Sequence, residues 1–149
     1  MQATSRKPAR AGLTLLRLHM VDEGPHVDDL KGLLSQEERD RARRFARRDD
    51  AARYVVGHGR LRQWLGRHLE VAPRSLRFIA NEHGKPMLDA LPSSPCFNLS
   101  HSGDWVLIGI DENHPIGIDV EAIRPTMAKI DDFRGVLAPE AQDWLDRLP

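Results

Sequence analysis

Apolar residues follow two spacings along this chain, and each spacing predicts its own kind of element. Short alternating or continuous apolar runs predict strands at residues 13–20, 76–80, 87–88, 105–110 and 116–121. From residue 35 to residue 69, apolar residues recur every three or four positions, as they do on one face of a helix. The polar stretch at residues 22–29 contains Gly24 and Pro25, so we expect a loop there.

The helical region divides into two predicted helices. Ser35 and Glu38 form an S-x-x-E capping box, which indicates that the first helix begins there and continues to about residue 47. Arg41 and Arg44 recur at helical spacing and share a face with Arg48. That face either binds an anionic ligand or is simply a solvated basic surface.

The second helix is predicted from Asp49 or Asp50 to Leu69. Its apolar stripe contains Ala51, Tyr54, Val55, His58, Leu61, Leu65 and Leu69. His58 lies on this stripe, so a buried, hydrogen-bonded histidine is a simpler interpretation than a ligand-binding one. Gly57 and Gly59 each cost about 1 kcal/mol relative to alanine in a helix. We therefore expect them to permit close packing or the close approach of a ligand.

Polar residues precede the first of the last two predicted strands, and acidic residues lie within the second. Ser100 and His101 belong to a polar cluster that precedes the first of them. Asp119 and Glu121 are two positions apart in the second, and alternation along a strand puts them on the same face. A D-x-E pair of hard oxygen ligands suits Mg²⁺, which usually takes one or two carboxylates. The alternative is a strand end that exposes two solvated acids.

A turn at residues 81–86 presents Lys85 just before a short strand. A lysine on a turn is suited to contact a phosphate group, although exposed turn lysines are common. At the two ends of the chain, residues 1–11 are expected to form a disordered polar tail. Residues 126–149 are expected to be helical in pieces.

Composition narrows the classes of function. The chain has 22 basic and 22 acidic residues, which argues against a nucleic-acid partner, although residues 35–70 hold ten arginines against six acids. The single cysteine, Cys96, excludes an internal disulfide bond. No apolar run approaches the roughly 20 residues that cross a bilayer. We therefore expect a cytoplasmic protein of about one domain with no membrane partner.

The order of the motifs along the chain is more specific than any one of them. An LSxxExxRxxRF pattern starting at residue 34 is followed by RY and GH in the second helix. GKP, FNLSHSGDW and IGIDVE then follow in that order. This order resembles the surfactin-type 4'-phosphopantetheinyl transferases over about residues 34–125. These enzymes move the phosphopantetheine arm of coenzyme A onto a serine of an acyl or peptidyl carrier protein.

The resemblance implies an α+β fold, in which an antiparallel sheet packs against helices to form one half of a pseudo-dimer. Residues 12–125 would be this N-terminal half-domain, and residues 126–149 would begin the segment that links it to a second half. Coenzyme A and Mg²⁺ would lie between the halves. By motif, Asp119 and Glu121 would be the magnesium ligands. The expected coenzyme contacts are Arg41, Arg44, Arg53, Lys85, Ser100 and His101.

One family motif is not found in this sequence. The second half of these enzymes carries W-x-x-K-E-A, whose glutamate is a further metal ligand and whose lysine is the usual candidate for the general base. Trp144 is followed by a different sequence, so no catalytic base is identified. We therefore expect the chain to pair with a copy of itself or with a complementary second half. The alternative is a non-catalytic module that binds coenzyme A or a carrier protein.

Overall fold

The structure is a computed structural model that describes residues 12–80, 82, 85–89, 94–123 and 139. The predicted tail at residues 1–11 lies outside the described residues. The predicted helical pieces at residues 126–149 also lie outside them, apart from Pro139. Within the described ranges the chain is α+β, with antiparallel strands and helices, as the resemblance implies.

Three strands form the main sheet, in the order β1-β5-β4, and both pairings are antiparallel. Strand β1 spans Leu13–His19, β4 spans Cys96–Ser102 and β5 spans Trp105–Asp111. A two-residue turn joins β4 to β5, and its first residue, Gly103, has φ +55, which favours glycine. A second sheet is the hairpin of β2 (Phe78–Ala80) and β3 (Pro86–Leu88).

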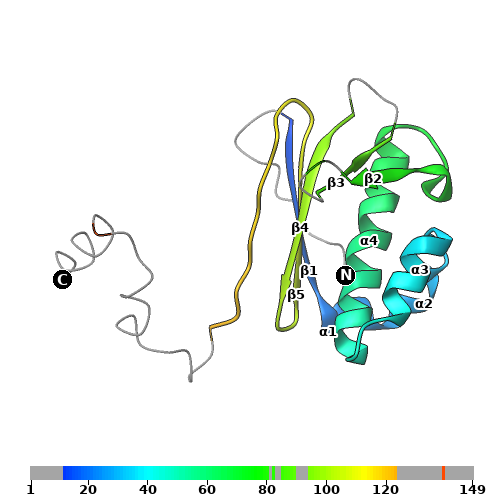
Figure 1. Cartoon of the computed structure of the whole chain (residues 1–149), viewed down its shortest axis with the longest axis vertical. Coiled ribbons are helices and arrows are strands. Elements are labelled where there is room, and N and C mark those ends of the chain that lie inside the picture. Colours follow the sequence, from blue (N-terminus) through cyan, green and yellow to red (C-terminus); the bar gives the residue numbers. More distant parts are fainter. Residues whose placement is uncertain (1–11, 81, 83–84, 90–93, 124–138, 140–149) are drawn as a thin grey trace.

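Helices cover one face of the main sheet (Figure 1). The longest, α4, spans Arg48–His68 and follows α3, which spans Gln36–Arg43. Ser35 caps α3 through the reciprocal hydrogen bonds of the predicted capping box. Before α3 lie α1 (Met20–Glu23), a 3-10 turn at Gly24–His26 and α2 (Val27–Lys31), and a further 3-10 turn at Pro73–Ser75 follows α4.

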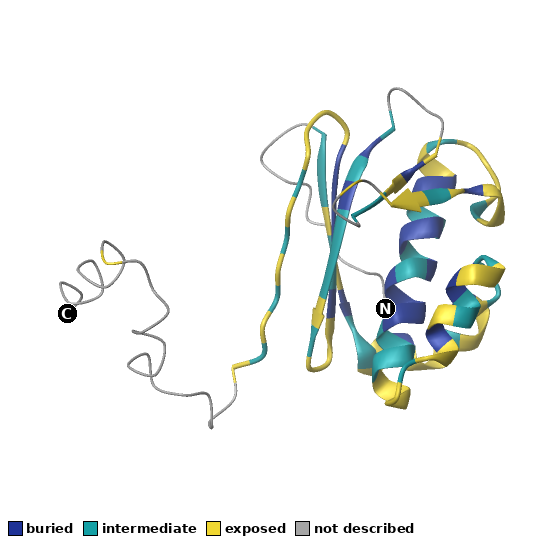
Figure 2. Ribbon diagram, in the orientation of Figure 1, coloured by how far each residue is buried: buried dark blue, intermediate teal, exposed yellow. Residues whose placement is uncertain are grey.

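The core lies between α4 and the sheet, where the buried residues of both gather (Figure 2). Val106, Ile108 and Ile110 alternate along β5 and are at most 1% exposed. Gly57 brings α4 close to this face, since a Cβ there would lie 3.2 Å from Leu99 and 3.3 Å from Val106. At Gly59 a Cβ would lie only 2.7 Å from Leu30 Cβ in α2. The two glycines thus permit close packing, as the sequence predicts.

Residues 115–123 do not form the strand that their alternation predicts. The segment is extended and lies along the face of the sheet opposite α4 (Figure 1), but it joins no backbone ladder. Ile116 and Ile118 pack on this face at Gly109, where a Cβ would lie 2.7 Å from Ile118 and 2.9 Å from Ile116. Alternation therefore predicts the extended backbone correctly and the strand pairing wrongly.

One other expectation is wrong, one strand was not predicted, and one boundary differs. Residues 22–29, expected to be a loop, are mostly helical, because Leu30 and its neighbours pack against α4. The polar cluster that contains Ser100 and His101 is part of β4, a strand that the sequence pattern does not predict, and this strand pairs with β5 along its whole length. The first long helix ends at Arg43 and not near residue 47.

Among the helices that the structure describes, none has the length and apolar character needed to cross a membrane.

Candidate functional site

A cavity of about 740 Å³ lies between α3, α4, the β2–β3 hairpin and β4. Four of the six expected coenzyme contacts line it. They come from four places in the chain: α3, α4, the turn before β3, and β4. These residues are Arg41, Arg53, Lys85 and His101. The fold therefore brings to one cavity basic side chains that are up to 60 positions apart in the sequence.

The other two expected contacts lie outside this cavity. Arg44 borders a neighbouring hollow on α3, which it shares with Arg41. Ser100 pairs with Leu107, between the inward-facing Val106 and Ile108, so its side chain lies on the sheet face away from α4. Ser100 thus faces the extended segment that follows β5.

Arg53 already has two partners in this structure. Its Nη2 lies 2.6 Å from Asp50 Oδ1, and its Nη1 donates a hydrogen bond to the carbonyl of Gly103 over 2.8 Å. The hydrogen bond from Arg53 lowers the pKa of Asp50 below its usual value. Arg53 therefore fastens the β4–β5 turn to α4 at the border of the cavity.

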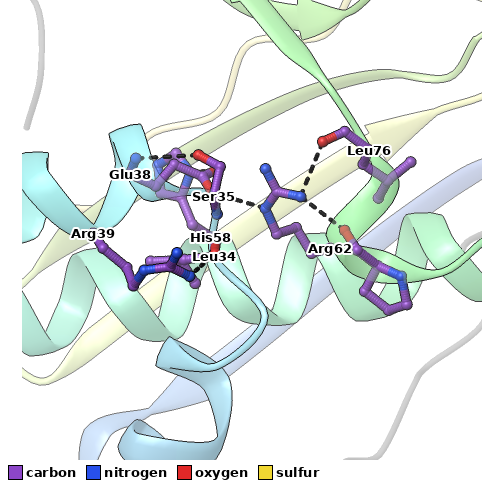
Figure 3. Close-up of polar contacts among 8 residues, drawn as sticks. Leu34, Ser35, Glu38, Arg39, His58, Arg62 and Leu76 are labelled. Atoms are coloured by element: carbon purple, nitrogen blue, oxygen red, sulfur yellow. Dashed lines mark hydrogen bonds and ion pairs between the residues drawn. The ribbon is translucent and has the colours of Figure 1, made fainter.

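A charged network forms one wall of the cavity (Figure 3). Glu38 accepts hydrogen bonds from Arg62 Nε (2.8 Å) and the Ser35 amide (2.7 Å), and its other oxygen lies 3.2 Å from His58 Nδ1. Burial of the Glu38 carboxyl opposes ionisation. The contacts with His58, the Ser35 amide and Arg62 outweigh it and lower the pKa to about 2. Glu38 is therefore ionised at neutral pH.

His58 is satisfied by hydrogen bonding, as expected, but it lies at the cavity wall and is half-buried. Its ring stacks on the ring of Tyr54, with the ring centroids 4.1 Å apart. The guanidinium group of Arg41 also lies over the Tyr54 ring, 5.7 Å from its centroid. Burial, together with the negative charge of Glu38, raises the pKa of Tyr54 to about 12. This part of the cavity wall thus consists of two stacked rings with a guanidinium group against one of them.

The two acids lie side by side on the other face of the sheet. Asp119 Oδ1 accepts a hydrogen bond from Ser100 Oγ over 2.6 Å, and Glu121 Oε2 accepts one from Ser102 Oγ over 3.1 Å. Because Ser100 and Ser102 are two positions apart on β4, their side chains lie on one face. Both acids are exposed to solvent.

Lys85 links the cavity to the segment that carries the acids. Its side chain borders the cavity, and its Nζ donates a hydrogen bond to the carbonyl of Ile116. Ile116 lies three positions before Asp119. A ligand phosphate held by Lys85 would therefore lie near the start of the acidic segment.

Asp119 and Glu121 are candidate metal ligands. Within the described ranges, no three His, Cys, Asp or Glu side chains gather closely enough to hold a metal ion. A magnesium ion usually takes one or two protein carboxylates and completes its shell with water and substrate phosphates. Asp119 and Glu121, with one oxygen each bonded to a serine, fit that donor set.

Two residues of this region were not singled out from the sequence. Arg62 is 1% exposed and forms an ion pair with Glu38. The sequence gives no sign of this burial, because arginines are common in this helix. Arg77 borders the cavity from the segment before β2. It is exposed and lies between the buried Leu76 and the half-buried Phe78, an alternation that could have indicated a side chain facing away from the core.

The chain was compared with known proteins. Residues 25–113 match the family model described as "4'-phosphopantetheinyl transferase, N-terminal". Over 99 residues the chain is 39% identical to the 4'-phosphopantetheinyl transferase ffp of Bacillus subtilis, covering 66% of this chain and 43% of that protein. For the 4'-phosphopantetheinyl transferase Sfp of Bacillus subtilis (strain 168) the identity is 38% over 97 residues, with 65% and 42% covered.

A third relative extends the match. The 4'-phosphopantetheinyl transferase HetI of Nostoc sp. is 33% identical over 151 residues, which cover 95% of this chain and 64% of that protein. The chain thus spans less than half the length of the two Bacillus relatives, and the family model that it matches is an N-terminal one. The chain belongs to the surfactin-type 4'-phosphopantetheinyl transferase family, of which it carries the first half.

Proposed function

We propose that residues 12–125 are the coenzyme-binding half of a magnesium-dependent transferase. The enzyme moves 4'-phosphopantetheine from coenzyme A to a serine of an acyl or peptidyl carrier protein in the cytoplasm. The observation that carries the proposal is that Arg41, Arg53, Lys85 and His101 line one cavity. Lys85 also bonds to the carbonyl of Ile116, in the segment that carries the two proposed metal ligands on the other face of the sheet.

The residues of the cavity suit a ligand with several phosphates. Arg41 is exposed on α3, and Lys85 and His101 approach from the opposite wall. Charge-assisted hydrogen bonds to phosphate oxygens are shorter and stronger than neutral ones. The half-buried ring of Phe45 borders the cavity, with its centroid 5.4 Å from that of Tyr54, and suits contact with the planar base of a nucleotide. Coenzyme A carries both chemical groups.

The reaction asks the protein for charge neutralisation and positioning. The carrier serine hydroxyl attacks the β-phosphate of the coenzyme, and adenosine 3',5'-bisphosphate leaves. Basic side chains that are fixed before the reaction stabilise the negative charge that develops on the phosphate oxygens. Asp119 and Glu121 would hold Mg²⁺, which would neutralise further charge on the diphosphate when bound.

We also propose that a second half completes the site. A general base and a third metal ligand would come from a complementary second half, because a second copy of this sequence would also lack the W-x-x-K-E-A motif. The outer face of the sheet is suited to such a contact, since Leu15 and Trp105 are partly exposed there and Ile123 is 95% exposed. Exposed apolar groups of this kind favour association.

Binding of coenzyme A by the whole chain tests the proposal. Each charge-assisted contact contributes roughly 1.5–3 kcal/mol. Lys85→Ala and His101→Ala should therefore each weaken binding about tenfold or more, as measured by isothermal titration calorimetry, and added salt should weaken it further. Arg43→Ala is the matched control, because Arg43 lies on α3, pairs with Asp40 and does not border the cavity. Unchanged affinity in both cavity variants would contradict the proposed site.

A further inference from the structure

Ser100 holds the extended segment by two hydrogen bonds of different kinds. Its hydroxyl donates to Asp119 Oδ1 over 2.6 Å and accepts from the backbone amide of Val120 over 3.1 Å. A serine hydroxyl has one donor and two acceptor sites, so one side chain can make both bonds. The serine therefore fixes the carboxylate and the backbone of the next residue together.

Ser102 repeats this arrangement two positions later. Its hydroxyl donates to Glu121 Oε2 over 3.1 Å and accepts from the amide of Ala122 over 3.0 Å. From Ser100 to Ser102, a step of two residues along β4, the hydrogen-bond partners in the segment also advance by two residues. The segment therefore runs parallel to β4 in a fixed register. Side-chain hydroxyls take the place that backbone carbonyls have in an ordinary ladder.

The two ends of the segment are held to different degrees. At its start, Ile116 and Ile118 pack on Gly109, and Lys85 bonds to the carbonyl of Ile116. At its far end, Ala122 meets the β4–β5 turn, where a Cβ on Gly103 would lie 3.3 Å from its Cβ. Asp119 follows the well-packed part. Glu121 lies beyond it, and Ser102 joins this end to the sheet by its hydrogen bonds to Glu121 and to the amide of Ala122.

Each serine also takes only one oxygen of its carboxylate. Within the described residues, the second oxygen of Asp119 and of Glu121 has no hydrogen-bond partner and can bind a cation, and the serine bond limits how the carboxylate turns. Fixing ligands before the metal arrives reduces the entropy lost on binding, and partners of this kind are known to affect metal affinity strongly.

We propose that Ser102 is a positioning residue, which sets the register of the segment on β4 and holds Glu121 beside Asp119 for a divalent cation. The inference has two parts. The register part rests on the hydrogen bonds alone. The cation part rests on the proposed function, in which the two acids are metal ligands.

The test uses the whole chain and the variants Ser102→Ala and Ser102→Thr. Ser75→Ala is the control. The Ser75 hydroxyl also makes a hydrogen bond, to the carbonyl of Ala72, but it lies in a turn that is distant in sequence from the segment. Amide hydrogen exchange is measured by NMR without metal. Losing a hydrogen bond of ordinary strength should speed exchange at Ala122 by about fivefold. Threonine, which keeps the hydroxyl, should restore protection.

Cation affinity is measured with Mn²⁺ alone, by electron paramagnetic resonance of the free ion, since Mn²⁺ accepts the same oxygen ligands as Mg²⁺. Ser102→Ala should weaken Mn²⁺ binding about tenfold, and threonine should restore it. Unchanged exchange at Ala122 in Ser102→Ala would overturn the register part. Unchanged Mn²⁺ affinity in Ser102→Ala, with loss of binding in Asp119→Ala, would overturn the cation part.

The variants Asp119→Ala and Glu121→Ala separate this inference from the proposed function. If neither changes Mn²⁺ affinity, the metal assignment of the proposed function is wrong, and the cation part falls with it. The exchange measurement then still decides the register part by itself.

Discussion

Arg62 Nε donates a hydrogen bond over 2.8 Å to Glu38 Oε2, at a position where Arg62 is 1% exposed. Its Nη1 also donates to the carbonyls of Pro73 and Leu76. One guanidinium thus joins α3 and α4 to the segment that leads into the β2–β3 hairpin, and so holds three walls of the cavity in place.

Removing this guanidinium should destabilise the fold. Arg62→Met would leave the Glu38 charge buried without its main partner, and breaking a buried ion pair in this way costs about 3–5 kcal/mol. Urea denaturation measures the change in the free energy of unfolding. Arg43→Ala, which breaks an exposed pair with Asp40, should cost less than about 1 kcal/mol. Equal effects of the two variants would show that the buried network is not a major source of stability.

Glu38 should make stability depend on pH in the acid range. The folded-state pKa is about 2, below the ordinary glutamate value of 4.5, so the unfolded chain binds the proton more tightly. The stabilisation is therefore complete above about pH 4.5 and is lost as the pH falls toward 2. It amounts to about 3 kcal/mol for this shift.

Comparison with Glu38→Gln isolates this contribution. Glutamine does not titrate, so the difference in unfolding free energy between the two proteins should shrink as the pH falls from 5 to 3, by about 1–2 kcal/mol. Chemical denaturation at several pH values measures the difference. A difference that stays constant over this range would contradict the low pKa.

The two glycines of α4 should respond differently to alanine. At Gly59 the new Cβ would lie 2.7 Å from Leu30 Cβ, so α2 must move, and overpacking of this kind costs about 1–3 kcal/mol. At Gly57 the nearest atoms are side-chain methyl groups at 3.2 and 3.3 Å, which can shift slightly. The gain in helix propensity, about 1 kcal/mol, should offset much of that cost. Thermal unfolding of both variants decides between these expectations.

Magnesium should tighten coenzyme binding through Asp119. We expect Asp119→Ala to remove the difference in coenzyme A affinity between solutions with Mg²⁺ and solutions with a chelator. The unfolding midpoint should change little, because the Asp119 side chain is exposed. Calorimetry in both solutions measures this. Asp22→Ala, at an exposed position in α1, serves as the control. A magnesium effect that persists in Asp119→Ala would remove Asp119 from the metal site.

Local signals in the sequence account for part of the fold. The capping box at Ser35 and the apolar stripe of α4 are visible because they depend on residues within a few positions of each other. Strand β4 was missed because its alternating residues include Asn98, Ser100 and Ser102, and the pairing with β5 that makes it a strand depends on the rest of the sheet. The short helices α1 and α2 have no side-chain cap, and their contacts with α4 are distant in sequence: Leu30 of α2 is buried in the core, and an ion pair joins α1 to α4.

The residues of the candidate site also divide into those that the sequence indicates and those that only the fold shows. Motif order placed Arg41, Arg53, Lys85 and His101 in one site, and the structure shows that they line one cavity. Arg62 could not be found by such means, since only the fold shows that its guanidinium is buried against Glu38. The opposite faces taken by Ser100 and His101 follow from strand alternation, but only once residues 96–102 are known to be a strand.

Gly109 has a consequence for how variation along this chain should be interpreted. Its backbone does not have a positive φ, and it does not border the cavity of the candidate site, so neither turn geometry nor contact with a ligand in that cavity requires a glycine there. What requires it is the space filled by Ile116 and Ile118. In a deep mutational scan for coenzyme binding, position 109 should tolerate few replacements, and the loss should be relieved by smaller residues at 116 or 118. A pairwise dependence of this kind would identify Gly109 as a spacer between the sheet and the acidic segment.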